Sequence, residues 1–373
     1  NSSGEGVVIA TSGPNTPSYV TVTGNTIRRC KNGILTRGTL TNRISKIRVS
    51  DNTIHHCGFA QDITAPVDGF EAYPMGVGFS HTDDSTVSNN TIYKIGQVMN
   101  DAGAESFWTG GAPTDDNNSA GINAWNCSRL DILSNHVSDT MANGTGQNYG
   151  IYVQQKSAGA VATAFNTESV NVTGNSIVWA SGLAGNGVGY KGVVFDCTLG
   201  TDVNPTTYSL VGLSVSQNSV RRTRNTGIEV LVGADCNVSN AQVNQNNTDS
   251  TCQAGTAKTG ALAVGVYDGV AGNSAMFQHV AVCQNQIRAS VTYGIYLPAL
   301  HLGEFSDVRV TDNTLAATVL SGVYLEADPG TAPVTIKKIS IDQNQSIGFA
   351  TGGGTHHGGH IEDVSGKVGT LAK

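Results

Sequence analysis

The chain has 373 residues, of which 46 are glycine; only 13% of the residues are charged and 39% are hydrophobic. This length suits about two or three ordinary domains or one long repeat domain. A glycine-rich, charge-poor composition is typical of many short strands joined by turns. The net charge of −7 argues against a nucleic acid partner, because phosphate binding needs a basic surface. No segment approaches the roughly 18 apolar residues of a membrane helix, so we expect no membrane insertion.

The seven cysteines form no CxxC or Cys/His pattern typical of a metal site. Isolated cysteines of this kind favour small buried fillers of the core over a disulfide framework. We therefore expect free thiols, and the cysteines do not decide the compartment.

One phrase recurs from the start of the chain: apolar-x-apolar-x-x-Asn-x-apolar. It appears first as VTVTGNTI, which ends at Ile27, and returns as IRVSDNTI, which ends at Ile54. Later copies are more widely and unevenly spaced, as expected when loops of different length interrupt a repeat. The repeated asparagines are Asn25, Asn52, Asn90, Asn135, Asn175, Asn218, Asn246, Asn285, Asn313 and Asn344.

A second phrase, Gly followed by apolar-x-apolar, alternates with the first. It runs from GILT at 33–36 to GVYL at 322–325, and one copy is irregular, with GALAVGVYD at 260–268. Apolar alternation with a period of two in short β-branched runs predicts strands rather than helices.

Two short strands separated only by x-x-Asn cannot form a hairpin and keep one apolar face, but they can turn a corner. If every copy turns the same corner, the asparagine amides stack and satisfy one another from coil to coil. We therefore predict an all-β fold, a single-stranded right-handed parallel β-helix (solenoid) of about ten coils with an asparagine ladder, over residues 1–350. Residues 351–373, rich in glycine and histidine, are expected to form a C-terminal cap or tail.

The alternation of the two phrases from Tyr19 to Ile347 resembles the right-handed parallel β-helix carbohydrate-active proteins of the pectate-lyase-like superfamily. It is most similar to the bacteriophage tailspike depolymerases. The resemblance implies a polysaccharide partner, a homotrimer, an extracellular or virion-surface location, and a cleft along the sheet of the Gly-apolar strands. It is specific for the fold rather than for one activity, because this architecture hosts many reactions.

The outward positions of the Gly-apolar strand are therefore the place to look for a site, and two long loops at 57–75 and 96–119 flank this strand. The second residue after each glycine forms the Gly+2 column: Leu35, Gly78, Asn123, Tyr152, Val194, Glu229, Tyr267, Tyr296 and Tyr324. The fourth residue forms the Gly+4 column: Arg37, Ser80, Trp125, Gln154, Asp196, Leu231, Pro298 and Glu326.

The aromatic residues of these columns suit sugar rings, which stack on flat aromatic faces. The competing interpretation is a purely stabilising tyrosine ladder, because tyrosine favours strands. The substrate-binding residues predicted from the columns and the second long loop are Tyr152, Trp125, Gln154, Tyr267, Tyr296, Tyr324, Glu326 and Trp108.

Two carboxylates, Asp196 and Glu229, lie in the middle of the columns on successive coils, displaced by two residues. Strand geometry gives a Cα separation of about 8 Å. That range includes the roughly 6.5–9.5 Å carboxyl separation of inverting glycosidases. With apolar sequence neighbours, Glu229 is predicted as the catalytic acid and Asp196 as the base; the alternative is two solvated surface carboxylates. Further candidates are Glu105, Asp115, Asp116 and Glu326.

Three functions remain open at this point. The first is a glycoside hydrolase that degrades a bacterial surface glycan, and the second is a uronate polysaccharide lyase or epimerase using Lys191, Arg37 or Tyr152. The Tyr-Gly and Asp-Pro-His motif of alginate epimerases is missing, since Tyr149-Gly150 leads into Ile-Tyr-Val. The third is a non-catalytic adhesin or structural β-solenoid. No cofactor is expected; calcium at Asp83-Asp84 or Asp115-Asp116 is conceivable but not indicated.

Overall fold

The computed structural model divides the chain into two compact units. Unit 1 comprises Asn1–Gln154 and Asn171–Val194, and unit 2 comprises Gln155–Val170 and Phe195–Lys373. All regular structure in the described residues is β-strand, so this part of the chain offers no helix that could cross a membrane. The structure describes residues 4–11, 15–39, 41–58, 74–99, 105–107, 119–140, 148–155, 165–179, 190–197, 208–233, 235–252, 259–267, 275–300, 303–317, 321–327, 334–347 and 359–362.

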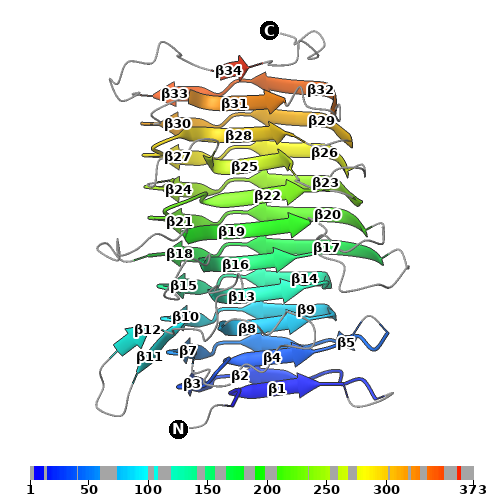
Figure 1. Cartoon of the computed structure of the whole chain (residues 1–373), viewed down its shortest axis with the longest axis vertical. Coiled ribbons are helices and arrows are strands. Elements are labelled where there is room, and N and C mark those ends of the chain that lie inside the picture. Colours follow the sequence, from blue (N-terminus) through cyan, green and yellow to red (C-terminus); the bar gives the residue numbers. More distant parts are fainter. Residues whose placement is uncertain are drawn as a thin grey trace. The chain divides into compact units, whose positions relative to one another are not determined.

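The strands form three parallel sheets, numbered here in the order in which the chain enters them (Figure 1). Sheet 1 contains the Gly-apolar strands. In unit 1 these are β1 (Val7–Ala10), β4 (Ile34–Arg37), β8 (Met75–Ser80), β13 (Ser119–Trp125) and β16 (Asn148–Gln154). Strand β19 (Tyr190–Cys197) begins in unit 1 and ends in unit 2. Unit 2 has β22 (Ile228–Val232), β25 (Gly260–Val266), β28 (Tyr293–Ala299), β31 (Ser321–Ala327) and β34 (Gly359–Glu362).

Sheet 2 contains the strands that precede each repeated asparagine. They are β2 (Thr21–Thr23), β6 (Arg48–Ser50), β9 (Thr82–Ser88), β14 (Ser128–Leu133), β17 (Phe165–Thr173), β20 (Tyr208–Ser216), β23 (Cys236–Asn244), β26 (Ala275–Cys283), β29 (Gly303–Thr311) and β32 (Val334–Asp342). The short strand β5 (Ile44–Ser45) also pairs with β9.

Sheet 3 contains the short strands that follow each asparagine. They are β3 (Thr26–Arg28), β7 (Thr53–His55), β10 (Thr91–Tyr93), β15 (His136–Ser138), β18 (Ser176–Val178), β21 (Ser219–Arg221), β24 (Asn247–Asp249), β27 (Gln286–Arg288), β30 (Thr314–Ala316) and β33 (Gln345–Ile347). Outside the three sheets, β11 (Gln97–Met99) and β12 (Glu105–Phe107) pair antiparallel.

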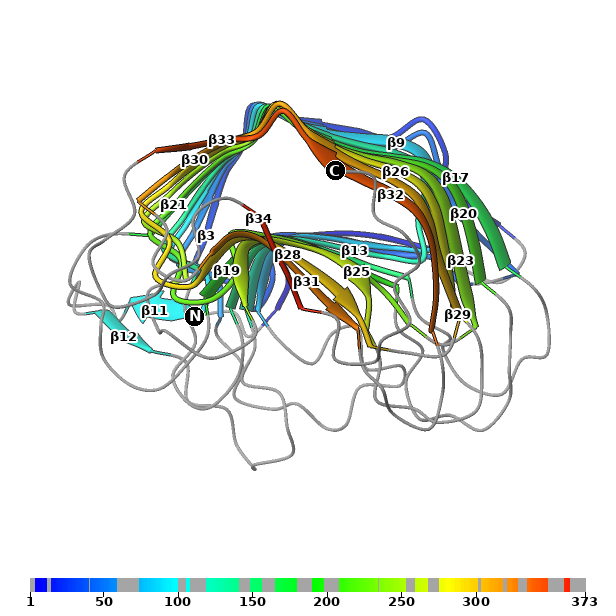
Figure 2. The same cartoon turned by 90° about the horizontal axis from the view of Figure 1, so that it is seen from above.

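The order of the strands confirms the predicted parallel β-helix. In each unit the chain passes from sheet 1 through sheets 2 and 3 and returns to sheet 1 beside the previous strand (Figure 2). Such crossovers between parallel strands are right-handed in nearly all proteins. Residues 359–362, within the segment predicted to be a cap or tail, add β34 to sheet 1 beside β31.

The corner between sheets 2 and 3 is built from two residues with fixed roles. The residue before each repeated asparagine adopts a left-handed backbone, with φ between 54° and 71° at all ten corners. The asparagine then hydrogen-bonds to its successor: in unit 1 the Asn90 amide Nδ2 donates to Asn135 Oδ1 at 2.9 Å and to Val49 O at 3.0 Å. In unit 2 Asn246 Nδ2 donates in the same way to Asn285 Oδ1 at 3.0 Å and to Val215 O at 2.8 Å. These bonds satisfy polar groups that the corner buries.

The glycine near the start of most sheet 1 strands is explained by a close approach. A Cβ atom on Gly121 would lie 2.3 Å from Val137 Cγ1 and 2.7 Å from the Gly150 carbonyl oxygen. Because a β-branched residue of sheet 3 fills this space in one coil of unit 1 after another, a side chain at these glycines would clash unless its neighbours moved.

The outer faces of the sheets differ in burial. Strands of sheets 2 and 3 alternate buried and more exposed residues, as in β14 and β15. In several strands of sheet 1 both faces are buried, and every residue of β8, β13 and β25 is buried. Sheet 1 is thus covered on the side that faces away from the core.

Candidate functional site

The register of sheet 1 places the outward residues in the two columns inferred from the sequence. In unit 1 it aligns Leu35, Gly78, Asn123 and Tyr152 as the Gly+2 column, and Arg37, Ser80, Trp125 and Gln154 as the Gly+4 column. In unit 2 it aligns Glu229, Ala263, Tyr296 and Tyr324 in the first column, and Leu231 beside Gly265 and Pro298 beside Glu326 in the second.

Tyr267 is the exception, and its predicted place in the Gly+2 column is wrong. Ala263 occupies that place, and Tyr267 lies just beyond β25, where its N–H donates to Val232 O at 3.0 Å. The prediction counted from Gly265, whereas the register counts from Ala261, opposite Gly227. A shift by an even number of residues keeps the same side chains inward, so alternation alone could not detect it. The Tyr267 side chain is nevertheless 48% exposed.

The columns are largely covered rather than open to solvent. Glu229 is only 8% exposed, and Tyr152, Tyr296, Tyr324 and Glu326 are likewise buried. The more accessible outward residues near the middle of the sheet are Gln154, Asp196 and Leu231, which are half-buried. Access to this face near the middle of the sheet is therefore greatest at these three positions of the Gly+4 column.

Asp196 and Glu229 lie on neighbouring strands of unit 2 in the predicted displacement. The Gly233 N–H donates to Cys197 O at 2.8 Å, which places Cys197 opposite Val232 and therefore Asp196 opposite Leu231. Glu229 is two residues before Leu231 on the same face. With strands about 4.8 Å apart and two residues spanning about 6.6 Å, the two Cα atoms are about 8 Å apart.

Three tyrosines and a carboxylate form a cluster further along sheet 1 in unit 2. The rings of Tyr293 and Tyr324 stack with centroids 4.2 Å apart, and Tyr296 stacks on Tyr324 at 5.9 Å. The Tyr296 hydroxyl donates to Glu326 Oε2 at 2.7 Å. Burial, followed by this bond to a carboxylate, raises the pKa of Tyr296, so that its phenol stays protonated. Tyr293 was missed from the sequence, because it precedes the glycine from which the columns were counted.

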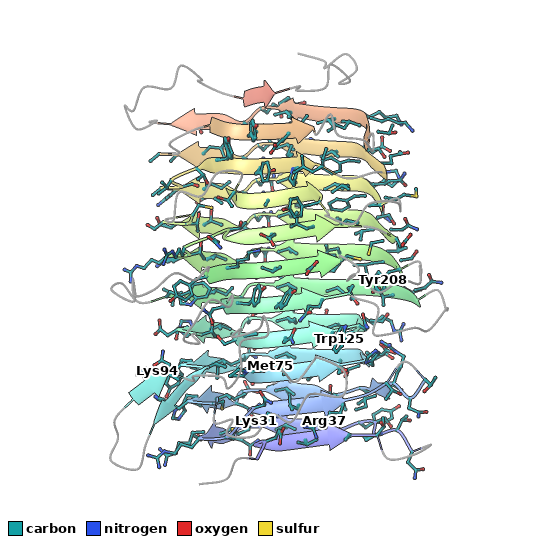
Figure 3. All side chains as sticks on the ribbon, viewed as in Figure 1. Lys31, Arg37, Met75, Lys94, Trp125 and Tyr208 are labelled. Carbon is teal, nitrogen blue, oxygen red and sulfur yellow. The ribbon has the colours of Figure 1, made fainter. Side chains whose placement is uncertain are left out.

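Unit 1 has its own aromatic and polar groups in the same columns. Tyr152 stacks on Tyr149 with centroids 4.1 Å apart, and Gln154 Nε2 donates to Asn123 Oδ1 at 3.0 Å. Trp125 lies at the end of β13 (Figure 3), with its indole 6.0 Å from the His81 ring. These residues contact one another, so the columns are packed surfaces and not rows of isolated side chains.

A partly buried polar network borders the end of β8. The Arg43 guanidinium donates to Asp83 Oδ2 at 2.6 Å and to the Asn126 carbonyl at 2.6 Å. Beside it, His81 Nδ1 is 2.9 Å from Ser80 Oγ. Burial and the nearby Arg43 charge lower the pKa of His81 from 6.5 to about 4, so the imidazole is neutral at ordinary pH.

The remaining candidates contribute less to a site. Asp83 and Asp84 pair with Arg43 and Arg129, an arrangement that suits structural ion pairs better than a calcium site. Within the described residues no group of three or more His, Cys, Asp or Glu side chains is placed to hold a metal ion. Trp108, Asp115 and Asp116 lie outside the described residues, and of Glu105 only the strand is described.

Comparisons with known proteins identify similar structures but no family. No protein-family model matches the chain, and no curated protein sequence matches it. Among solved structures, the A-module of the mannuronan C-5 epimerase AlgE6 from Azotobacter vinelandii is 13% identical, with a TM-score of 0.38 over 87% of this chain and 73% of that one. A double mutant of the periplasmic alginate epimerase AlgG is 11% identical, with a TM-score of 0.31 over 85% and 75%. PfbA, a surface adhesin of Streptococcus pneumoniae, is 10% identical, with a TM-score of 0.32 over 88% and 79%.

Proposed function

We propose that this protein binds a polysaccharide along the outward face of sheet 1 and hydrolyses it with Asp196 and Glu229, in the manner of a tailspike-like depolymerase. The observation that carries the proposal is the pair of carboxylates on neighbouring strands, offset by two residues on one face. A Cα separation of about 8 Å allows a carboxyl separation in the range where an inverting enzyme accommodates a water molecule.

The two carboxylates differ in their surroundings, which suggests different roles. Glu229 is buried beside Ala263, whereas Asp196 is half-buried and closer to solvent. In an inverting reaction Glu229 would protonate the leaving glycosidic oxygen, and Asp196 would take a proton from the attacking water. The more accessible position suits the base, since the base must be reached by water.

The aromatic residues of unit 2 supply surfaces for sugar rings on the side of the pair where β25, β28 and β31 lie. Tyr267 exposes nearly half of its side chain next to the carboxylate-bearing strands. Tyr296, buried and fixed by its hydrogen bond to Glu326 and by stacking against Tyr324, would form a rigid support beneath the sugar-binding surface. A rigid aromatic contact loses little conformational entropy on binding.

Incubation of the whole protein with capsular, O-antigen and uronate glycans tests the proposal. Hydrolysis produces new reducing ends without the ultraviolet absorbance of unsaturated uronate products. New reducing ends together with that absorbance would replace hydrolysis by a lyase reaction. Binding without cleavage of any glycan would overturn the hydrolase assignment.

As part of the same proposal, the protein acts outside the cell or on a virion surface and assembles as a homotrimer. The support is the resemblance of the two alternating sequence phrases to tailspike proteins, whose substrates are surface glycans. Sedimentation equilibrium of the purified chain measures the assembly directly. A mass of one chain at all concentrations would reject the trimer and leave the carboxylate assignment untouched.

A further inference from the structure

Two cysteines of unit 1 lie one above the other in successive coils. Cys30 Sγ and Cys57 Sγ are 3.2 Å apart. Each cysteine directly follows a residue with a left-handed backbone, Arg29 or His56, at the end of a sheet 3 strand. The backbone continues the stacking, because the Gly58 N–H donates to Cys30 O at 2.8 Å. The two side chains therefore occupy equivalent places and point toward each other.

The two thiols of this pair differ in exposure and acidity. Cys30 is 4% exposed, whereas Cys57 is completely buried. A hydrogen bond from the Cys57 thiol to Cys30 lowers the pKa of Cys30 and raises that of Cys57, and burial raises the pKa of Cys57 further. The less deeply buried of the two cysteines is thus also the one whose thiol is more readily ionised. Thiolate character and access are the two properties that make a cysteine reactive.

We propose that Cys30 and Cys57 form an intrachain disulfide by exchange with a low-molecular-weight organic disulfide. The Cys30 thiolate attacks one sulfur of that disulfide, forms a mixed disulfide and releases one small thiolate. The Cys57 thiol then loses its proton, and its sulfur attacks Cys30, releasing the second small thiol. Two cysteine thiols are oxidised and one small disulfide is reduced to two thiols, so atoms and electrons balance.

The bond would fasten the first coils of unit 1 to each other. It would close a loop between residues 27 apart in sequence. In the described structure β1 pairs with β4 alone, so this end of sheet 1 has one neighbouring strand where inner strands have two. An end strand is where local unfolding begins most easily, and a covalent link between adjacent coils opposes it.

Unit 2 contains a second cysteine pair that serves as an internal control. Cys197 and Cys236 also interact side chain to side chain, but both are completely buried. Burial raises the pKa of Cys197. Both cysteines of this pair are more deeply buried than Cys30, so native exchange should not link them.

The test uses the folded full-length protein incubated with oxidised glutathione. After unfolding and alkylation of free thiols, unreduced tryptic peptides are mapped by mass spectrometry; cleavage after Lys31 and Arg37 separates Cys30 from Cys57 unless they are linked. The expected result is a Cys30–Cys57 link in most molecules, with Cys127, Cys197 and Cys236 still alkylated. The thermal midpoint of the oxidised protein should rise by roughly 5 °C.

Variants separate native exchange from reaction of unfolded chains. Cys57→Ser should stop at the mixed disulfide with glutathione on Cys30, and Cys30→Ser should leave Cys57 unmodified; Cys127→Ser should behave as the parent protein. If a serine variant fails to fold, the map of the parent protein still decides. Failure of Cys30 to link to Cys57, or equally fast linkage of Cys197 to Cys236, would overturn the proposal.

Discussion

The outer face of sheet 1 and the outer faces of sheets 2 and 3 are built from the same repeat but present opposite surfaces. In unit 2 every residue of β25 is buried, whereas β26 and β27 alternate buried and more exposed positions. A parallel sheet is usually covered on both faces, and a solenoid can leave an outer face to water only where polar residues fill it. This difference indicates that the outward side chains of sheet 1 serve to make contacts and not to keep the protein soluble.

The residues of the two kinds of face support this distinction. The outward columns of sheet 1 carry buried carboxylates, an indole and stacked phenols, including Glu229, Trp125 and Tyr324. On sheet 2 of unit 2 the outward residues are polar or charged for the most part, as at Ser239, Gln278 and the ion pair between Lys337 and Glu304, with Val211 and Met276 also exposed. Buried polar groups are costly unless they are satisfied, so their concentration on one face points to a use for them.

The largest expected effect comes from the two carboxylates of sheet 1. Glu229→Gln and Asp196→Asn should each lower the rate of glycan cleavage by about 10²–10⁴-fold, since each removes one proton-transfer group. The measurement is release of reducing ends under substrate saturation. The matched change Asp312→Asn, at an exposed corner of the same unit, should leave the rate unchanged. Equal activity in all three variants would place the chemistry elsewhere.

The second prediction concerns the asparagines that hold the coils in register beneath both kinds of face. Asn246→Ala leaves the amide of Asn218, the Val215 carbonyl and the Asn285 side chain without this partner. We expect a loss of about 3–4 kcal/mol in the free energy of unfolding. Chemical denaturation measures it. Asn237→Ala, at a half-buried outward position of sheet 2, should cost less than about 1 kcal/mol. Similar losses of stability in the two variants would mean that the buried asparagine amides stabilise the fold no more than a half-buried outward asparagine does.

The third prediction concerns the pH dependence of stability that arises from His81, beside the end of β8. The folded-state pKa of His81, about 4, lies below the ordinary value of 6.5, so the unfolded chain takes up the proton first as the pH falls. The contribution of neutral His81 to the free energy of unfolding is complete above pH 6.5. It is lost as the pH falls toward 4, by roughly 2–3 kcal/mol.

Urea denaturation at pH 7 and pH 4.5 measures this loss, and two histidine variants identify its source. His81→Gln should flatten the pH dependence, whereas His279→Gln, whose imidazole is exposed on sheet 2, should not change it. If His81→Gln shows the same dependence of stability on pH as the parent protein, other groups cause the acid sensitivity.

The fourth prediction concerns the phenol that bonds Glu326. Tyr296→Phe keeps the stacked ring but removes the donor to a buried carboxylate, and should destabilise the protein by about 1–2 kcal/mol. Thermal unfolding provides the measurement. Tyr19→Phe, at a side chain that is 75% exposed, should stay within about 0.5 kcal/mol of the parent. If Tyr296→Phe leaves the stability unchanged, other groups satisfy the hydrogen bonding of Glu326.

The smallest effect is expected on the outer face of sheet 2. Val211→Thr keeps a β-branched side chain at a position that is 52% exposed, and should change stability by less than about 0.5 kcal/mol. A loss above about 1 kcal/mol would mean that this face is covered by another chain in solution, and the contrast between the faces would then need to be redrawn.

The sequence was sufficient for the fold because one corner is repeated with little variation. In most copies the asparagine, the apolar residues three positions before it and two positions after it, and the glycine of the next sheet 1 strand occupy fixed places. The order of the strands and the face on which each side chain lies can therefore be counted from the sequence, as for Asp196 and Glu229. The predicted column position was wrong for Tyr267, because Ala261 replaces the glycine in that coil. Tyr293 was not predicted, because it precedes the glycine. Burial of Glu229 could not be predicted, since it depends on what lies over the sheet and not on the repeat.

The left-handed residue before each asparagine also has a consequence for how such a chain can change its length. Because Ser219 and Asn247 open equivalent strands, removing residues 219–246 would join Asn218 to Asn247 and delete one full coil without altering the frame of either neighbour. Duplication of the same segment would add a coil by the same rule. The corner thus acts as a joint at which whole coils can be exchanged, and the architecture can grow or shrink by recombination while each surviving coil keeps its fold.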